Sequence, residues 1–159
     1  MEDVDLVEWK ANVAHAIDVA ASKAENISVG GLSTGGTLSL HAAATNAKIN
    51  DTLYLFSAAL DLAGGPWGLL GDMGEIALRT FLADLLDRNK PLIGESPYRY
   101  SHVDLDGAQQ LSLLIKETDR IIGQHDRKNP FPKPVFAAHS EKDKTARIDG
   151  IEDLEDVCD

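Results

Sequence analysis

The sequence predicts an α/β protein with a parallel β-sheet and helices packed on its faces. Three short apolar runs, residues 27–31, 52–57 and 134–139, have the composition of buried strands. Helical patterns separate these runs, and a strand, a helix and a second strand in succession form a βαβ unit with parallel strands. We therefore expect three parallel strands near these positions.

Residues 4–24 are predicted to form the first helix. Apolar residues recur there at spacings of three and four, which places them on one stripe of a helix. The expected stripe comprises Val7, Ala11, Ala14, Ile17 and Ala21.

A strand, a glycine-rich turn and a small-residue helix come next, within residues 26–44. The turn contains the pattern Gly31-x-Ser33-x-Gly35, the sequence form of a nucleophile elbow. A serine at the apex of such a turn is exposed to a substrate, and we expect Gly31 and Gly35 to remove Cβ atoms that would obstruct it. The backbone N–H of Thr34, at the start of the helix, would be one donor to an oxyanion. The alternatives are a plain glycine-rich turn with an exposed serine and a phosphate loop, although the lysine of a phosphate loop does not follow these glycines.

With these residues the chain resembles the α/β-hydrolase family, in particular its lid-bearing serine esterase and lipase branch. The resemblance implies a three-layer parallel sheet, present in part, with a helical cap inserted between strands. About seventy residues separate the second and third strands, which is longer than an ordinary crossover. We therefore expect core at residues 1–60, a cap or lid at 61–130 and core again at 131–159. The alternative is an ordinary pair of crossover helices, at 76–87 and 107–123.

The acid of a serine hydrolase is expected after the third strand. In the family, the order along the chain is Ser, then Asp or Glu, then His. Asp143 lies in the loop after the third strand, and the resemblance implies that it is the catalytic acid. Asp61, after the second strand, is the second choice, since some family members carry the acid there. The alternative is that Asp143 only caps its turn.

The base is not apparent in the chain. No histidine follows Asp143, and the five histidines lie at positions 15, 41, 102, 125 and 139. The early loop that supplies a second oxyanion donor in the family is missing as well. The resemblance thus covers the middle of the family's domain, and we expect this chain to be a fragment, running from the elbow strand through the acid loop.

The amino-acid composition limits which binding partners and which cellular compartment we expect for this protein. The net charge of −11 disfavours binding to nucleic acid or to an anionic membrane. Cys158 is the single cysteine, so neither an internal disulfide nor a cysteine-based metal site is expected. No signal peptide or membrane span is recognisable, and we expect a cytoplasmic protein.

The sequence thus predicts a serine hydrolase that acts on carboxylic esters through an acyl-enzyme on Ser33, with no metal and no cofactor. Its partner would be a small ester or acyl substrate, and an exposed sheet edge would favour self-association. The alternatives are a non-catalytic binding module on the same fold, or a thioesterase, peptidase or acyltransferase.

Overall fold

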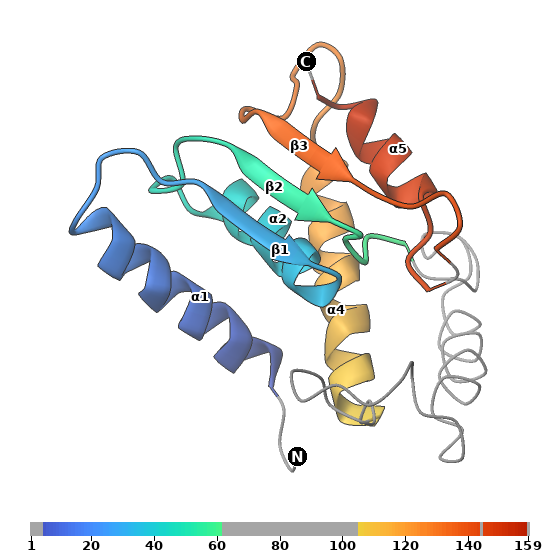
Figure 1. The fold of residues 1–159 in the computed structure, drawn as a ribbon, viewed down its shortest axis with the longest axis horizontal. Helices are drawn as coiled ribbons and strands as arrows, with labels where there is room; N and C mark the ends of the chain where they lie inside the picture. Colours follow the sequence, from blue (N-terminus) through green and yellow to red (C-terminus); the bar gives the residue numbers. More distant parts are fainter. Residues whose placement is uncertain (1–4, 62–104, 144, 159) are drawn as a thin grey trace.

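The computed structural model describes residues 5–61, 105–143 and 145–158. Within these residues the elements follow one another in the order α1, β1, α2, β2, α4, β3 and α5 (Figure 1). Their bounds are α1 Leu6–Ala21, β1 Val29–Leu32, α2 Thr34–Thr45, β2 Leu53–Phe56, α4 Leu105–Ile122, β3 Val135–Ala138 and α5 Asp149–Glu155.

The three strands form one parallel sheet in the order β1-β2-β3, which confirms the predicted α/β class. Their register is even, and the last residues of the strands, Leu32, Phe56 and Ala138, pair across the sheet. The first strand begins later than expected because Ile27 hydrogen-bonds a loop: its N–H donates to the Asn50 side chain, and its carbonyl accepts from Asn50 and Asp51. All three strands therefore end at one edge of the sheet, in step with one another.

Helix α1 forms as predicted, but its buried face differs from the expected stripe. Asp5 caps its N-terminus by accepting a hydrogen bond from the N–H of Val7 at 2.8 Å. Leu6 and Ile17 are buried, whereas Val7 is 66% exposed and both Ala11 and Ala14 are exposed. The prediction of this stripe was therefore wrong for Val7, Ala11 and Ala14. Periodicity finds a helix, but several stripes are apolar in a helix this rich in alanine and valine, and only packing selects one.

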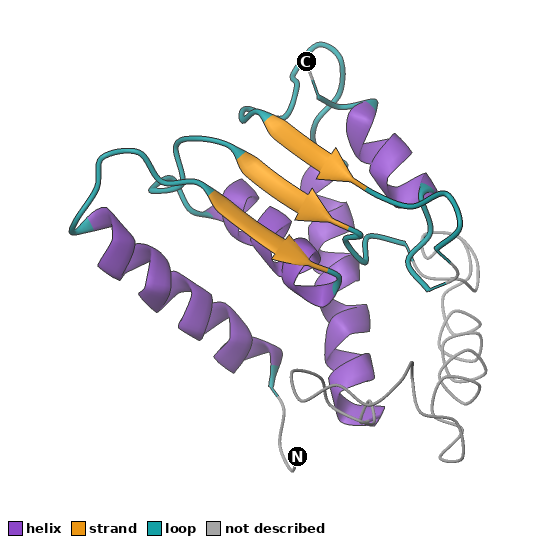
Figure 2. Cartoon of the chain, viewed as in Figure 1, coloured by secondary structure: helices purple, strands orange, loops and turns teal. Residues whose placement is uncertain are grey.

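The hydrophobic core lies on one side of the sheet. Residues of all four helices form or pack against a single cluster with the inward-facing residues of the strands. In the view of Figure 2, α2 and α4 pass behind the three strands. Leu53 and Leu55 of β2 are fully buried in this cluster, and Leu114 and Ile115 of α4 are also fully buried. Side chains alternate between the two faces of a strand, so β2 follows a buried-exposed-buried-exposed pattern.

The opposite face of the sheet carries no helix from the described residues. Leu32, Tyr54, Phe56 and Phe136 are 41–68% exposed on the strands. The ring of Phe136 lies 6.0 Å from that of Tyr54 and 6.1 Å from that of Phe56. The described residues thus form two of the three expected layers, the sheet and one layer of helices.

The expected cap at 61–130 lies largely outside the described residues, and so does the predicted helix at 76–87. The helix predicted at 107–123 is present as α4, and it packs against α2 in the layer that covers the sheet. The division of the chain into core and cap stays a prediction. In the described part of the chain, no helix is both long enough and apolar enough to cross a membrane.

Candidate active site

Ser33 occupies the sharp turn between β1 and α2. Its backbone has φ 53° and ψ −122°, a region that non-glycine residues rarely adopt. Such a conformation costs about 1–3 kcal/mol and is found mostly at functional sites. The side chain is exposed and makes no capping hydrogen bond to the helix, so its hydroxyl is accessible.

Backbone hydrogen bonds hold Ser33 in this conformation. Its N–H donates to the Phe56 carbonyl at 3.0 Å and so extends the β-ladder by one residue. Its carbonyl accepts from the N–H groups of Gly36 at 2.9 Å, Thr37 at 3.3 Å and Ala59 at 3.2 Å. The neighbouring strand end and the first turn of α2 therefore fix the position of the serine.

Thr34 is the first residue of α2, directly after the serine. Neither its N–H nor that of Gly35 donates to a backbone carbonyl among the described residues, as is usual in the first turn of a helix. These N–H groups and the helix dipole favour negative charge beside Ser33. The role of the Thr34 N–H as an oxyanion donor stays a prediction.

The glycines of the turn differ in what they contribute. A Cβ on Gly31 would lie 2.2 Å from the carbonyl carbon of Gly35, so the strand and helix approach each other too closely for a side chain. A Cβ on Gly35 would meet nothing within 4 Å, and the expectation that Gly35 removes an obstruction was wrong. The second close approach is at Gly36, whose Cβ would lie 2.6 Å from that of Ala58. The motif spacing predicted a steric constraint at Gly35. The structure instead places the constraint at Gly36, where Ala58 in the segment after β2 leaves no room for a side chain.

Ser57 has a position after β2 that corresponds to the position of Ser33 after β1. It follows β2 directly, has φ 41°, and donates its N–H to the Ala138 carbonyl at 2.8 Å. The strand register therefore places Ser33, Ser57 and His139 one residue beyond three paired strand ends. In the sequence, this position is indicated by a serine at the end of an apolar run, in the same place relative to its strand as Ser33.

Asp143 lies in the loop after β3, at the same edge of the sheet as Ser33. Its Oδ1 accepts hydrogen bonds from the N–H groups of Thr145 at 2.9 Å and Ala146 at 3.1 Å. These bonds are the turn chemistry that was the alternative to an acid role, and they also fix the orientation of the carboxylate. Asp143 makes no hydrogen bond to Ser33, from whose strand it is separated by β2, and adjacent strands lie about 4.8 Å apart.

None of the four described histidines contacts Ser33 through a hydrogen bond or ion pair. His139 Nε2 lies 2.9 Å from the carbonyl oxygen of Ala146, which ties the end of β3 to the loop that carries Asp143. His41 Nε2 lies 3.4 Å from Glu117 on α4. His125 lies near the Asn129 carbonyl, and His15 is exposed on α1. His102 falls outside the described residues, and a base for Ser33 is therefore not identified.

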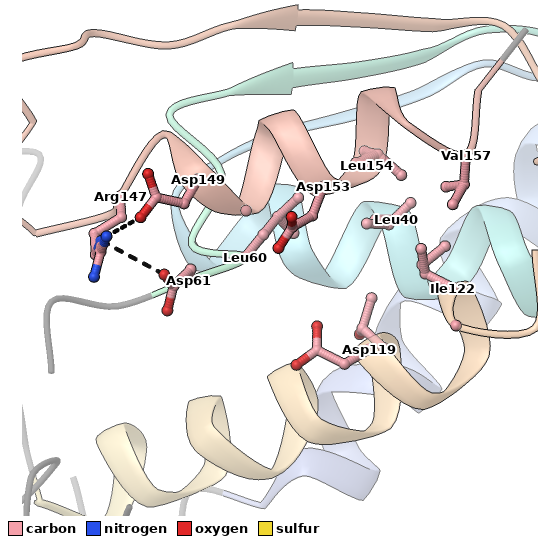
Figure 3. A pocket seen from close by; sticks show the side chains of 13 residues that line it. Leu40, Leu60, Asp61, Asp119, Ile122, Arg147, Asp149, Asp153, Leu154 and Val157 are labelled. Atoms are coloured by element: carbon pink, nitrogen blue, oxygen red, sulfur yellow. Dashed lines mark hydrogen bonds and ion pairs between the residues drawn. The ribbon is translucent and has the colours of Figure 1, made fainter. Parts of the chain in front are cut away.

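Asp61, the second choice for the acid, faces a cavity instead (Figure 3). Its Oδ2 lies 3.6 Å from Arg147 Nε, and its carbonyl accepts the N–H of Arg147 at 2.9 Å. The cavity has a volume of about 570 Å³ and lies among α2, α4 and α5. Neither Ser33 nor Asp143 lines it. Asp61 thus contacts Arg147 beside a cavity that Ser33 does not line, and it remains the second choice for the acid.

In the described part of the chain, no group of three or more His, Cys, Asp or Glu side chains is placed to hold a metal ion.

The architecture is similar to that of a solved structure reported in work on LipS and LipT, two metagenome-derived lipolytic enzymes. The two chains superpose with a TM-score of 0.68 at 16% sequence identity. The match covers 98% of this chain and 60% of the other. No family model and no curated protein matches the sequence.

At this level of identity the likeness defines the fold. It is a parallel α/β sheet of the α/β-hydrolase type, of which the described residues form three strands. The chain spans about three-fifths of the length of this neighbour.

Proposed function

We propose that Ser33 is the nucleophile of a serine hydrolase that cleaves carboxylic esters. The observation that carries the proposal is an exposed serine with positive φ at a strand-to-helix turn, clamped by backbone hydrogen bonds. The strain supports a functional reading because a solvent-exposed turn has no structural need for it. The neighbour's lipolytic activity is consistent with an ester as the substrate.

In the proposed reaction, Ser33 Oγ attacks the ester carbonyl carbon and a base accepts the hydroxyl proton. The N–H of Thr34 stabilises the oxyanion of the tetrahedral intermediate. As the C–O bond to the alcohol breaks, the base returns the proton to the leaving oxygen. Water, activated by the same base, then attacks the acyl-enzyme. This step releases the carboxylic acid product and regenerates the free hydroxyl of Ser33.

Asp143 is proposed as the acid that orients the base. Its backbone hydrogen bonds hold one carboxylate oxygen and leave the other for an imidazole. An imidazole that hydrogen-bonds both Ser33 and Asp143 would occupy the space at the strand ends between them. Because none of the four described histidines contacts Ser33, we propose that the base comes from polypeptide outside this chain.

Labelling with a fluorophosphonate probe tests the nucleophile without knowledge of the substrate. We expect slow labelling of this chain, because the serine is exposed but lacks a base, and loss of labelling in Ser33→Ala. Ser57→Ala is the matched control, since it removes a hydroxyl from the neighbouring strand end and should leave labelling unchanged. Labelling that persists in Ser33→Ala would refute the proposal.

The source of the base is tested separately. A longer polypeptide that supplies the base should label at least 100-fold faster, the usual contribution of general-base catalysis. If His102→Ala abolished labelling of the present chain, the base would lie within it, and this part of the proposal would be wrong.

The second candidate is a non-catalytic binding module on the same fold. It is favoured by one observation, that no described histidine contacts Ser33. This reading predicts no labelling of Ser33 in either the present chain or the longer one.

A further inference from the structure

Helix α1 is attached to the rest of the fold by few buried side chains. It lies at the border of the fold, packs on α2 and α4, and is followed by an exposed loop that leads to β1 (Figure 1). Leu6 and Ile17 are its buried residues, whereas Val7 and Val19 are exposed. A terminal helix that buries so little apolar surface opens at a lower free energy than the sheet.

The contact between α1 and α2 is also incompletely filled. A groove of about 330 Å³ runs between them and includes the turn after α2. Lys10, Val13 and Ile17 line the groove from α1, and Leu38 and His41 line it from α2. Because close packing is interrupted there, the polar groups beside the groove carry a larger share of the attachment.

Three titratable side chains meet at this groove, one from each of three helices. Lys10 Nζ of α1 lies 2.8 Å from Glu117 Oε2 of α4, and His41 Nε2 of α2 lies 3.4 Å from the same oxygen. The His41 side chain is 13% exposed, so a charge on it would be largely removed from water. Lys10 and Glu117 are the charged groups that face His41 from the described parts of α1 and α4, and Arg120 acts on Glu117.

A proton on His41 disturbs this arrangement. Burial of the positive charge and repulsion by Lys10 lower the pKa of His41 below 6.5, and attraction to Glu117 offsets this only in part. When α1 leaves, Lys10 moves away and water reaches the imidazole, so the released form holds the proton more tightly. The contribution of neutral His41 to docking is therefore present above pH 6.5 and is lost as the pH falls through the lowered pKa.

We propose that α1 is a proton-sensitive arm, which docks on α2 and α4 while His41 is neutral and is released when His41 takes up a proton. The sheet and the other helices stay folded in the released form, since the fully buried residues of β2 and α4 form the centre of the fold. None of the three side chains at the groove takes part in the proposed ester hydrolysis, so the two proposals stand or fall separately.

Amide hydrogen exchange of the unaltered protein at pH 7.5 and pH 5.5 tests the proposal. It is followed by NMR and corrected for the intrinsic exchange rates at each pH. We expect acidification to lower the protection of the α1 amides by about threefold or more relative to the β2 amides, which report global unfolding; a contact between unit charges in water has an effect of this order. A parallel change in α1 and β2 would mean that α1 is not released by itself and would overturn the proposal.

Two histidine variants assign the proton. His41→Gln should abolish the difference between α1 and β2, because glutamine stays neutral at both pH values. The matched control is His15→Gln, which removes an exposed histidine from α1 itself and should leave the difference unchanged. A difference that persists in His41→Gln, or that is lost equally in both variants, would refute the role of His41.

Asp119 of α4 also titrates in this range and needs its own control. Burial, followed by the nearby carboxylates of Asp61 and Asp153, raises its pKa from 3.8 to about 6. It lines the cavity among α2, α4 and α5 and not the groove beside α1. Asp119→Asn should therefore leave the pH-dependent release of α1 unchanged, and loss of the release in this variant would overturn the proposal.

Discussion

At the scale of single residues, Gly31 shows how closely the elbow is packed. The backbone of Gly35 occupies the position that a side chain on Gly31 would need, and backbone cannot move aside as a flexible side chain does. Gly35 is another glycine of the same turn, yet a Cβ atom added to it would lie in open space. The two glycines therefore form a matched pair for substitution.

We predict that Gly31→Ala lowers the free energy of unfolding by about 1–3 kcal/mol, the usual cost of overpacking. Gly35→Ala should change it by less than about 1 kcal/mol, because alanine is favoured in helices and meets no neighbour there. Urea unfolding followed by circular dichroism measures both. Equal destabilisation by the two substitutions would contradict the tight approach at Gly31.

At the scale of elements, a polar cluster joins three helices outside the cavity that Asp61 lines. Lys10 of α1 donates to Glu117 of α4 at 2.8 Å, and His41 of α2 lies 3.4 Å from the same carboxylate. Burial lowers the pKa of His41 below 6.5, and Lys10 lowers it further, while Glu117 offsets part of the effect. The folded protein thus favours the neutral form of His41 more than the unfolded chain does.

The lowered pKa of His41 makes stability depend on pH. Below pH 6.5 the unfolded chain takes up the His41 proton before the folded protein does, so this contribution to stability is lost as the pH falls from 6.5 through the lowered value. We predict that unfolding experiments at pH 7.5 and pH 5.5 show a greater loss on acidification for the natural protein than for His41→Gln.

The comparison with His41→Gln isolates this group, because Asp119 titrates in the same range with the opposite sign. Its raised pKa means that stability is lost as the pH rises through about 6. Both proteins keep Asp119, and its contribution cancels in the difference. An identical pH dependence of the two proteins would show that His41 does not contribute.

At the scale of the whole molecule, the helices lie on one face of the sheet and leave four large apolar residues exposed on the other. In addition, β1 and β3 each pair on one side only among the described residues. Exposed apolar faces and open strand edges both favour association with other chains. Self-association therefore remains a proposal with two physical causes.

We predict that this chain self-associates at micromolar concentration, and that Leu32→Ser with Phe136→Ser shifts it toward the monomer. The control is Val7→Ser with Val19→Ser, which removes two exposed apolar side chains from α1 and should leave association unchanged. Sedimentation velocity measures the oligomeric state of each protein. A monomer at all concentrations, or an equal effect of both double variants, would contradict the role of the sheet face.

The sequence by itself determined the α/β class, the three strands, the helices around them and the strand-to-helix turn at Ser33. These features depend on local periodicity and turn chemistry, which act between residues close together in the chain. The open edge of the elbow strand followed from the family resemblance, and the place of Asp143 in a loop after the third strand followed from the order of the elements.

Only the tertiary structure decided which side chains meet across the fold. The buried stripe of α1, the close contact of Gly36 with Ala58 and the alignment of Ser57 with Ser33 depend on elements distant in sequence. The same holds for the cavity, where Asp119 comes within the field of Asp61 and Asp153 only because α4 and α5 pack on α2. Long-range packing selects among several locally equivalent faces, and a single sequence does not record that choice.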